Sequence, residues 1–230
     1  MKRWAILVAA LYCLILVALT VPFLLMTFYG SLYGSNGPLA AVAEAAEVFA
    51  FWPYWIWVAV MVACQLALLS VPVRVASRRP VTQGALWPTI LAAGLMVGAL
   101  AAAAIFAIGE FIYRLEDTGN WLGWSGLVIG MLTWAAWAIV FRRAALIESP
   151  ADIVTRQCRL LLRGSILELL IAVPTHIVAR QRDYCCAGFM SFVGLTMGAA
   201  VMLFAFGPAL FYLFAARWRR LHPERAGVPE

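Results

Sequence analysis

One segment of the chain, residues 158 to 188, gathers most of the side chains that could do chemistry. It reads CRLLLRGSILELLIAVPTHIVARQRDYCCAG and holds three of the five cysteines and one of the two histidines. It also holds a carboxylate in an apolar run and several arginines. No other stretch combines these residue types, so a functional site is expected in this segment.

Two adjacent cysteines, Cys185 and Cys186, stand just before the last apolar run. Vicinal thiolates offer two soft donors for copper or zinc, and His176 or Cys158 could complete such a site. A helix N-terminus after the pair would favour the reactive thiolate. The pattern predicts a transition-metal or thiol redox site, with simple packing or a structural disulfide as the alternative.

Glu168 and His176 lie in one apolar stretch that has the length of a helix. On a helix, Glu168, Ala172 and Thr175 share a face, and His176 lies roughly 80° round from Glu168. Insertion of an unpaired carboxylate at membrane depth costs at least roughly 2.5 kcal/mol, so Glu168 needs a partner or a proton. The pair could serve as acid and base or as a proton relay, and a structural ion pair with Arg163 is the alternative.

Four arginines flank this stretch and could bind a lipid headgroup or the phosphate of a substrate. They are Arg159 and Arg163 before Glu168, and Arg180 and Arg182 after His176. A solvated basic loop is the plainer interpretation. If the stretch crosses the membrane, the two pairs lie on opposite sides and form no single pocket.

A separate candidate is a short serine motif at the start of the fourth apolar run, formed by Gly123, Trp124, Ser125 and Gly126. The string resembles the GxSG motif of rhomboid intramembrane proteases, which implies a serine and histidine dyad of Ser125 with His176. His176 departs from the family's AHxxG context, because Ile, Val and Ala follow it. A helix-packing seam made by the glycines explains the string without catalysis.

The composition requires a membrane protein. The chain is 65% hydrophobic and 12% charged, with a mean hydropathy of +0.91, which excludes a soluble globule. The net charge of +6 comes from short clusters between apolar runs, so no nucleic-acid surface is expected. The lone Lys2 leaves no buried amine for retinal or pyridoxal phosphate, and two histidines, His176 and His222, argue against a haem clamped by buried imidazoles.

The apolar runs predict an all-α polytopic transmembrane bundle in a single domain over residues 1–230. A span of the hydrocarbon core needs about 20 residues. About six spans are expected, of which the fifth is short, broken at its proline or re-entrant because it carries charges. Their ranges are 4–26, 51–73, 87–109, 121–141, 160–179 and 187–216, followed by a cytoplasmic tail at 217–230.

The loop charges predict the orientation. Loops rich in arginine and lysine alternate along the chain with loops that contain few basic residues. Because basic loops stay in the cytoplasm, this alternation predicts that both termini are cytoplasmic. A bacterial inner membrane is the expected location. Small residues at four-residue spacing predict packing seams that serve the bundle, a homo-oligomer or a membrane-protein partner. These pairs are Gly94 with Gly98, Gly126 with Gly130, and Gly194 with Gly198.

The sequence leaves three classes of function open and does not decide whether the chain is an enzyme. The first is a protein that carries or delivers a soft metal, or uses a thiol pair. The second is a non-catalytic subunit or assembly factor of a larger membrane complex, favoured by the scarcity of polar residues in the spans. The third is a small transporter or a lipid enzyme that uses Glu168 and His176.

Overall fold

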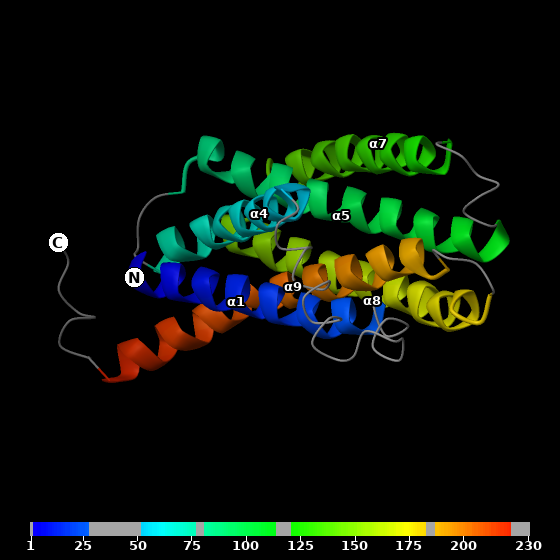
Figure 1. The fold of residues 1–230 in the computed structure, drawn as a ribbon. Coiled ribbons are helices and arrows are strands. Elements are labelled where there is room, and N and C mark those ends of the chain that lie inside the picture. Colours follow the sequence, from blue (N-terminus) through cyan, green and yellow to red (C-terminus); the bar gives the residue numbers. More distant parts are fainter. Residues whose placement is uncertain (1, 28–51, 77–80, 114–120, 183–186, 222–230) are drawn as a thin grey trace.

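The chain folds into a bundle of long helices. The computed structural model describes residues 2–27, 52–76, 81–113, 121–182 and 187–221, and these contain six helices and no strand. Figure 1 shows the helices side by side along one common direction. The bounds are α1 Lys2–Thr27, α4 Trp52–Ala76, α5 Gln83–Ile112, α7 Trp121–Ala144, α8 Pro150–Ala179 and α9 Phe189–Leu221. The expectation of an all-α helical bundle is confirmed.

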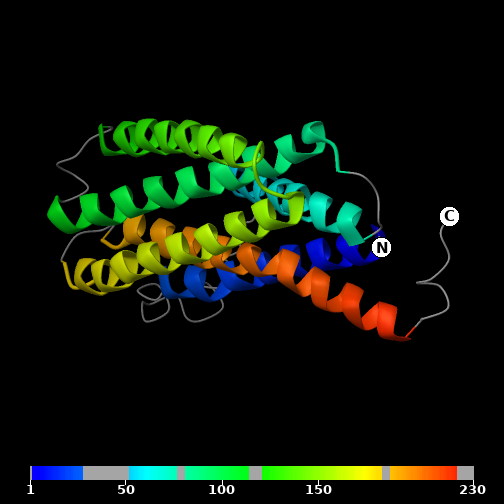
Figure 2. The ribbon, with the colours of Figure 1, turned by 180° about the vertical axis from the view of Figure 1, so that it is seen from behind.

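Five of these helices, α4, α5, α7, α8 and α9, are long and apolar enough to cross a membrane. In α1 the described apolar stretch is shorter, Ile6–Ile15, although the helix itself has 26 residues. Successive helices run in opposite directions, and α1 begins at the end of the bundle where α9 finishes (Figures 1 and 2). We call this the basic end, because α4, α7 and α8 place Arg74, Arg142, Arg143 and Arg156 there.

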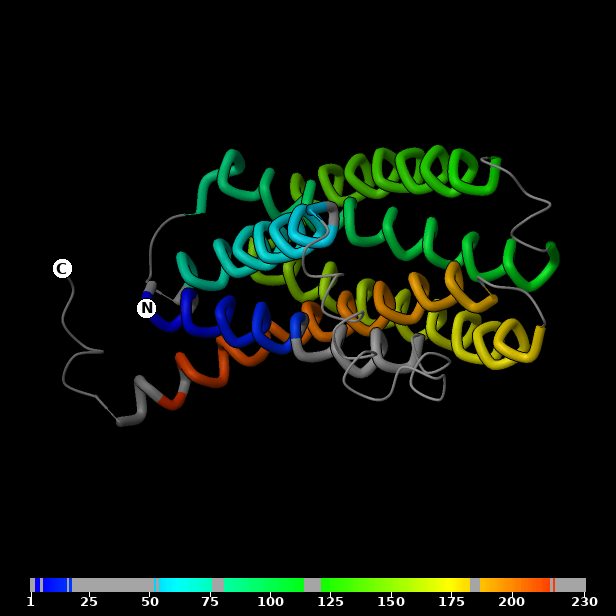
Figure 3. The backbone as a smooth tube through the Cα atoms, viewed as in Figure 1, coloured from blue at the N-terminus to red at the C-terminus, as the bar shows by residue number. Residues whose placement is uncertain are grey.

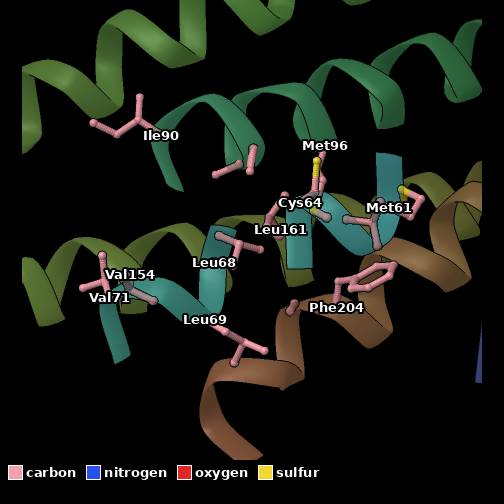
Figure 4. Close-up of a cluster of buried hydrophobic side chains, with 14 of the residues drawn as sticks. Met61, Cys64, Leu68, Leu69, Val71, Ile90, Met96, Val154, Leu161 and Phe204 are labelled. Carbon is pink, nitrogen blue, oxygen red and sulfur yellow. The ribbon is translucent and has the colours of Figure 1, made fainter. Parts of the chain in front are cut away.

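Two helices, α5 and α9, form the centre of the bundle. Helix α5 packs against α4, α7, α8 and α9, while α9 also packs against α1 and α4. Figure 4 shows side chains of α4, α5, α8 and α9 meeting in this core, among them Leu68, Met96, Leu161 and Phe204. Helix α7 lies at one edge beside α5 (Figure 3).

The predicted glycine seams occur, and they lie within the chain. A β-carbon at Gly98 of α5 would overlap the carbonyl oxygen of Gly130 on α7, so these two backbones touch directly. Gly126 of α7 makes room for the ring of Phe106 on α5 in the same way. Such close approach is how small residues hold membrane helices together.

The fifth span differs from the expectation of a short or broken segment. Helix α8 has 30 residues and continues past Pro174. It begins ten residues early because Ser149 caps it, accepting a hydrogen bond from the backbone N–H of Asp152 (3.3 Å), and because Pro150 suits the first turn. Beside Pro174, the hydroxyl of Thr175 donates to the carbonyl of Ile171 (2.8 Å), which helps to satisfy the backbone there.

Helix α8 buries several polar side chains among apolar ones, and its second half exposes large apolar side chains. Its buried face repeats at intervals of three and four residues and includes Gln157, Ser165, Glu168 and Thr175. The opposite face exposes large apolar side chains, namely Ile166, Leu167, Leu170, Val173, Ile177 and Val178. This is the pattern of a helix that faces lipid on one side and buries polar side chains in the bundle interior on the other.

Candidate functional site

The carboxyl group of Glu168 lies inside the bundle, between α8, α5 and α9. The residue is 3% exposed, and neither carboxyl oxygen has a hydrogen-bond partner among the described residues. The carboxyl occupies the space above two glycines of α9. A β-carbon at Gly194 would lie 2.9 Å from Oε1, and one at Gly198 would overlap Oε2. The third glycine pair therefore makes room for an acid.

This position is costly for a charge. A buried carboxylate without hydrogen bonds or a counter-ion loses its solvation and gains nothing in return. The neutral acid fits this environment, and the charged form requires a partner that the described residues do not supply. A group of this kind suits the binding and release of a proton.

Three further side chains in the described part of the chain have buried polar atoms without a hydrogen-bond partner: Gln65 of α4, Gln157 of α8 and Tyr212 of α9. The amide of Gln65 fills the space above Gly207, where a β-carbon would overlap its Nε2. The polar face of α8 from Gln157 to Thr175 extends over roughly 27 Å at 1.5 Å per residue. That length is close to the roughly 30 Å hydrocarbon thickness of a bilayer.

A second polar cluster lies at the end of the bundle opposite the basic end, where α5 and α8 finish and α9 begins. The fully buried Glu110 accepts hydrogen bonds from the backbone N–H groups of Gly188 (2.8 Å) and Ser191 (2.7 Å). Both of its oxygens are used, in contrast to those of Glu168. A carboxylate here satisfies the free N–H groups of the α9 N-terminus and opposes its positive partial charge.

Arg182 binds the free carbonyl oxygens at the C-terminus of α5, as Glu110 binds the free N–H groups at the start of α9. Its guanidinium donates to the carbonyl oxygens of Glu110 (2.7 Å) and Phe111 (2.6 Å) at the C-terminus of that helix. An acid thus stabilises the start of α9 and a base the end of α5. In the sequence, Arg182 precedes residues 183–186, and Gly188, which donates to Glu110, follows them.

His176 belongs to the same cluster. Its Nδ1 lies 3.1 Å from the carbonyl oxygen of Gly188 and 3.1 Å from the hydroxyl of Ser191. Gly188 has a φ of +92°, and a β-carbon there would crowd the side chains of Arg180 and His176, so glycine is required at this turn.

The serine and histidine dyad implied by the rhomboid resemblance is not formed. The hydroxyl of Ser125 donates to Leu122 of its own helix (2.9 Å), whereas His176 contacts Ser191 instead. Ser191 itself is fully buried, and its hydroxyl also donates to the carbonyl of Gly188 (3.2 Å). This histidine and serine pair therefore fastens the start of α9.

The structure separates several residues that the sequence grouped together. Glu168 and His176 contact different turns of α9 and stand roughly 12 Å apart along α8. Cys158 precedes His176 by roughly 27 Å on the same helix, which corrects the expectation that it could complete a site there. Cys185 and Cys186 lie outside the described residues. Among those described, no three His, Cys, Asp or Glu side chains gather as metal ligands.

The four candidate arginines also divide between the two ends of α8. Arg159 and Arg163 line a cleft between α7 and α8 toward the basic end. Arg180 and Arg182 lie at the opposite end, where Arg182 is engaged with α5. The two pairs therefore stand at opposite ends of α8 and do not form one pocket.

Sequence reasoning missed Glu110 as a site residue, although its position directly after an apolar run was visible. Its partners lie 78 and 81 residues further along the chain, so only the folded arrangement identifies them.

Comparison with protein-family models, with curated proteins and with solved structures finds no match for this chain.

Proposed function

We propose that this multi-pass membrane protein is a small proton-linked transporter in which Glu168 binds and releases the proton. The observation that carries the proposal is the burial of both Glu168 carboxyl oxygens without a hydrogen-bond partner in the described part of the chain. A purely structural acid is expected to have its partners in place, as Glu110 does. Intramembrane acids facing a bundle interior commonly mark proton or ion pathways.

The polar face of α8 supports the same function. Gln157 lies toward the basic end and Thr175 toward the opposite end, with Glu168 between them. Gln65 and Gln157 carry unused donors and acceptors that water or a small polar substrate could engage. A proton reaching Glu168 from either end would pass these groups.

The first test is proton flux through the protein in liposomes, driven by a potassium diffusion potential and followed with an enclosed pH-sensitive dye. We expect wild-type protein to acidify the lumen faster than protein-free liposomes do. Glu168→Gln should return the rate to the protein-free level, because glutamine keeps the shape of the acid but releases no proton. Glu148→Gln, which changes an acid in a surface ion pair, is the matched control and should leave the rate unchanged. A wild-type rate equal to that of empty liposomes would remove the transport proposal.

A second candidate, a soft-metal or thiol site, draws support from His176. If Nδ1 of His176 donates its proton to the Gly188 carbonyl oxygen (3.1 Å), Nε2 is unprotonated and its lone pair can bind a metal ion. A backbone carbonyl that fixes the histidine tautomer in this way is typical of metal-binding histidines. Cys185 and Cys186 precede Gly188 by only a few residues, so they are the ligands this proposal would pair with His176.

Metal content tests the second candidate. Protein extracted in mild detergent without chelator should carry near-stoichiometric copper or zinc, and Cys185→Ser with Cys186→Ser should lose it. Cys13→Ser with Cys64→Ser removes two thiols from α1 and α4 and is the control. Equal metal content in the two double variants, or none in the wild type, counts against a metal site.

A further inference from the structure

A cleft of about 460 Å³ lies between α7 and α8 toward the basic end. Trp137 and Phe141 of α7 form one wall, and Arg156, Arg159 and Arg163 of α8 contribute the positive charge. Helix α7 packs mainly on α5 and touches α8 only slightly, which leaves this space open between the two helices. The cleft thus joins aromatic rings to guanidinium groups.

Not all of these arginines are free to bind an anion. Arg156 forms an ion pair with Glu148, and the cleft residue Asp152 accepts a hydrogen bond from the Ser149 hydroxyl. Arg159 and Arg163 are exposed and have no ion-pair partner among the described residues. Two unpaired positive charges therefore remain, one helical turn apart.

A second, apolar hollow of about 410 Å³ lies further along α8, on its outer face. Its residues Ile166, Leu170 and Val173 follow Arg159 and Arg163 at alternating steps of three and four, so all five lie on one stripe of the helix. From Arg163 to Val173 the stripe measures roughly 15 Å. This equals about half the hydrocarbon thickness of a bilayer, the depth of one leaflet.

We propose that this stripe binds one anionic glycerophospholipid from the leaflet at the basic end. Arg159 and Arg163 bind the headgroup phosphate, Trp137 and Phe141 border the glycerol region, and one acyl chain lies along Ile166, Leu170 and Val173. Arg163 lies one turn before Ile166, the first exposed apolar residue of the spanning helix α8, and an unpaired cation at the edge of this lipid-facing stretch is unfavourable. A phosphate drawn to it supplies the missing counter-charge.

The test is lipid binding by native mass spectrometry, with phosphatidylglycerol and phosphatidylcholine of identical acyl chains titrated onto the protein in mild detergent. We expect one phosphatidylglycerol to bind at least about tenfold more tightly than phosphatidylcholine. Arg159→Gln with Arg163→Gln should weaken phosphatidylglycerol about thirtyfold, because each basic group near an anionic lipid contributes roughly fivefold. Phosphatidylcholine binding should change little.

Two controls distinguish this site from general attraction to charge. Arg74→Gln with Arg143→Gln removes the same charge from the same end outside the cleft, and it should retain the phosphatidylglycerol preference. Leu170→Trp fills the apolar hollow and should weaken the lipid severalfold. Equal loss in both arginine pairs, or no preference in the wild type, overturns the proposal. Competition by inorganic phosphate as effective as that by phosphatidylglycerol overturns it too, because the acyl chain would then contribute nothing.

Discussion

Replacement of Glu110 by alanine is expected to lower the free energy of unfolding by roughly 3 to 5 kcal/mol, the largest stability effect among the variants considered. The change removes two charge-assisted hydrogen bonds and leaves the buried N–H groups of Gly188 and Ser191 without their acceptor. Denaturing-detergent titration, followed by tryptophan fluorescence, measures the loss.

The stability of two other variants shows whether the loss in Glu110→Ala comes from its charged hydrogen bonds to α9. Glu110→Gln keeps an acceptor oxygen but not the charge, so it should lose less stability than the alanine variant. Glu148→Ala, which removes the acid of a surface ion pair, should change stability by no more than about 1 kcal/mol. If Glu110→Ala proves as stable as Glu148→Ala, the carboxylate does not fasten α9 to α5.

Gly198→Ala should destabilise the bundle by roughly 1 to 3 kcal/mol, although alanine is by far the better helix former. The added β-carbon would overlap Oε2 of Glu168 and would lie 2.9 Å from Cγ of Leu169. Combination with Glu168→Ala removes the first of these contacts and should restore part of the loss, giving a favourable coupling of about 1 kcal/mol between the two positions. The same detergent titration measures both variants.

Gly123→Ala provides the matched control, because nothing lies within 4 Å of a β-carbon at that position. It should leave stability unchanged or raise it slightly. Additive effects of Gly198→Ala and Glu168→Ala would contradict the placement of the carboxyl above Gly198.

Much of the fold follows from local sequence patterns. The apolar runs locate every described helix, and the glycine spacing marks Gly94, Gly98, Gly126 and Gly130 as packing positions, although only the structure shows that α5 and α7 pair through them. The main error concerned α8, which was expected to be a short, broken or re-entrant segment at 160–179 because it carries charges and a proline. The capping residues Ser149, Pro150 and Asp152 mark the true start of the helix.

The candidate site was predictable only in part. The sequence places Glu168, Ala172 and Thr175 on one helix face, and all three are buried together. It could not show that Glu168 has no hydrogen-bond partner among the described residues, since this depends on which residues of α5 and α9 surround it. The role of Glu110 depends on the position of a distant helix N-terminus, which no local pattern encodes.

Infrared difference spectroscopy of the protein in lipid tests whether Glu168 is a buried acid that binds a proton. At neutral pH the wild type should show the carbonyl stretching band of a neutral carboxylic acid. Titration to alkaline pH should convert it to a carboxylate band. In Glu168→Gln this change should be missing, while Glu148→Gln should retain it. Identical difference spectra for the wild type and Glu168→Gln would show that Glu168 is not the group that binds the proton.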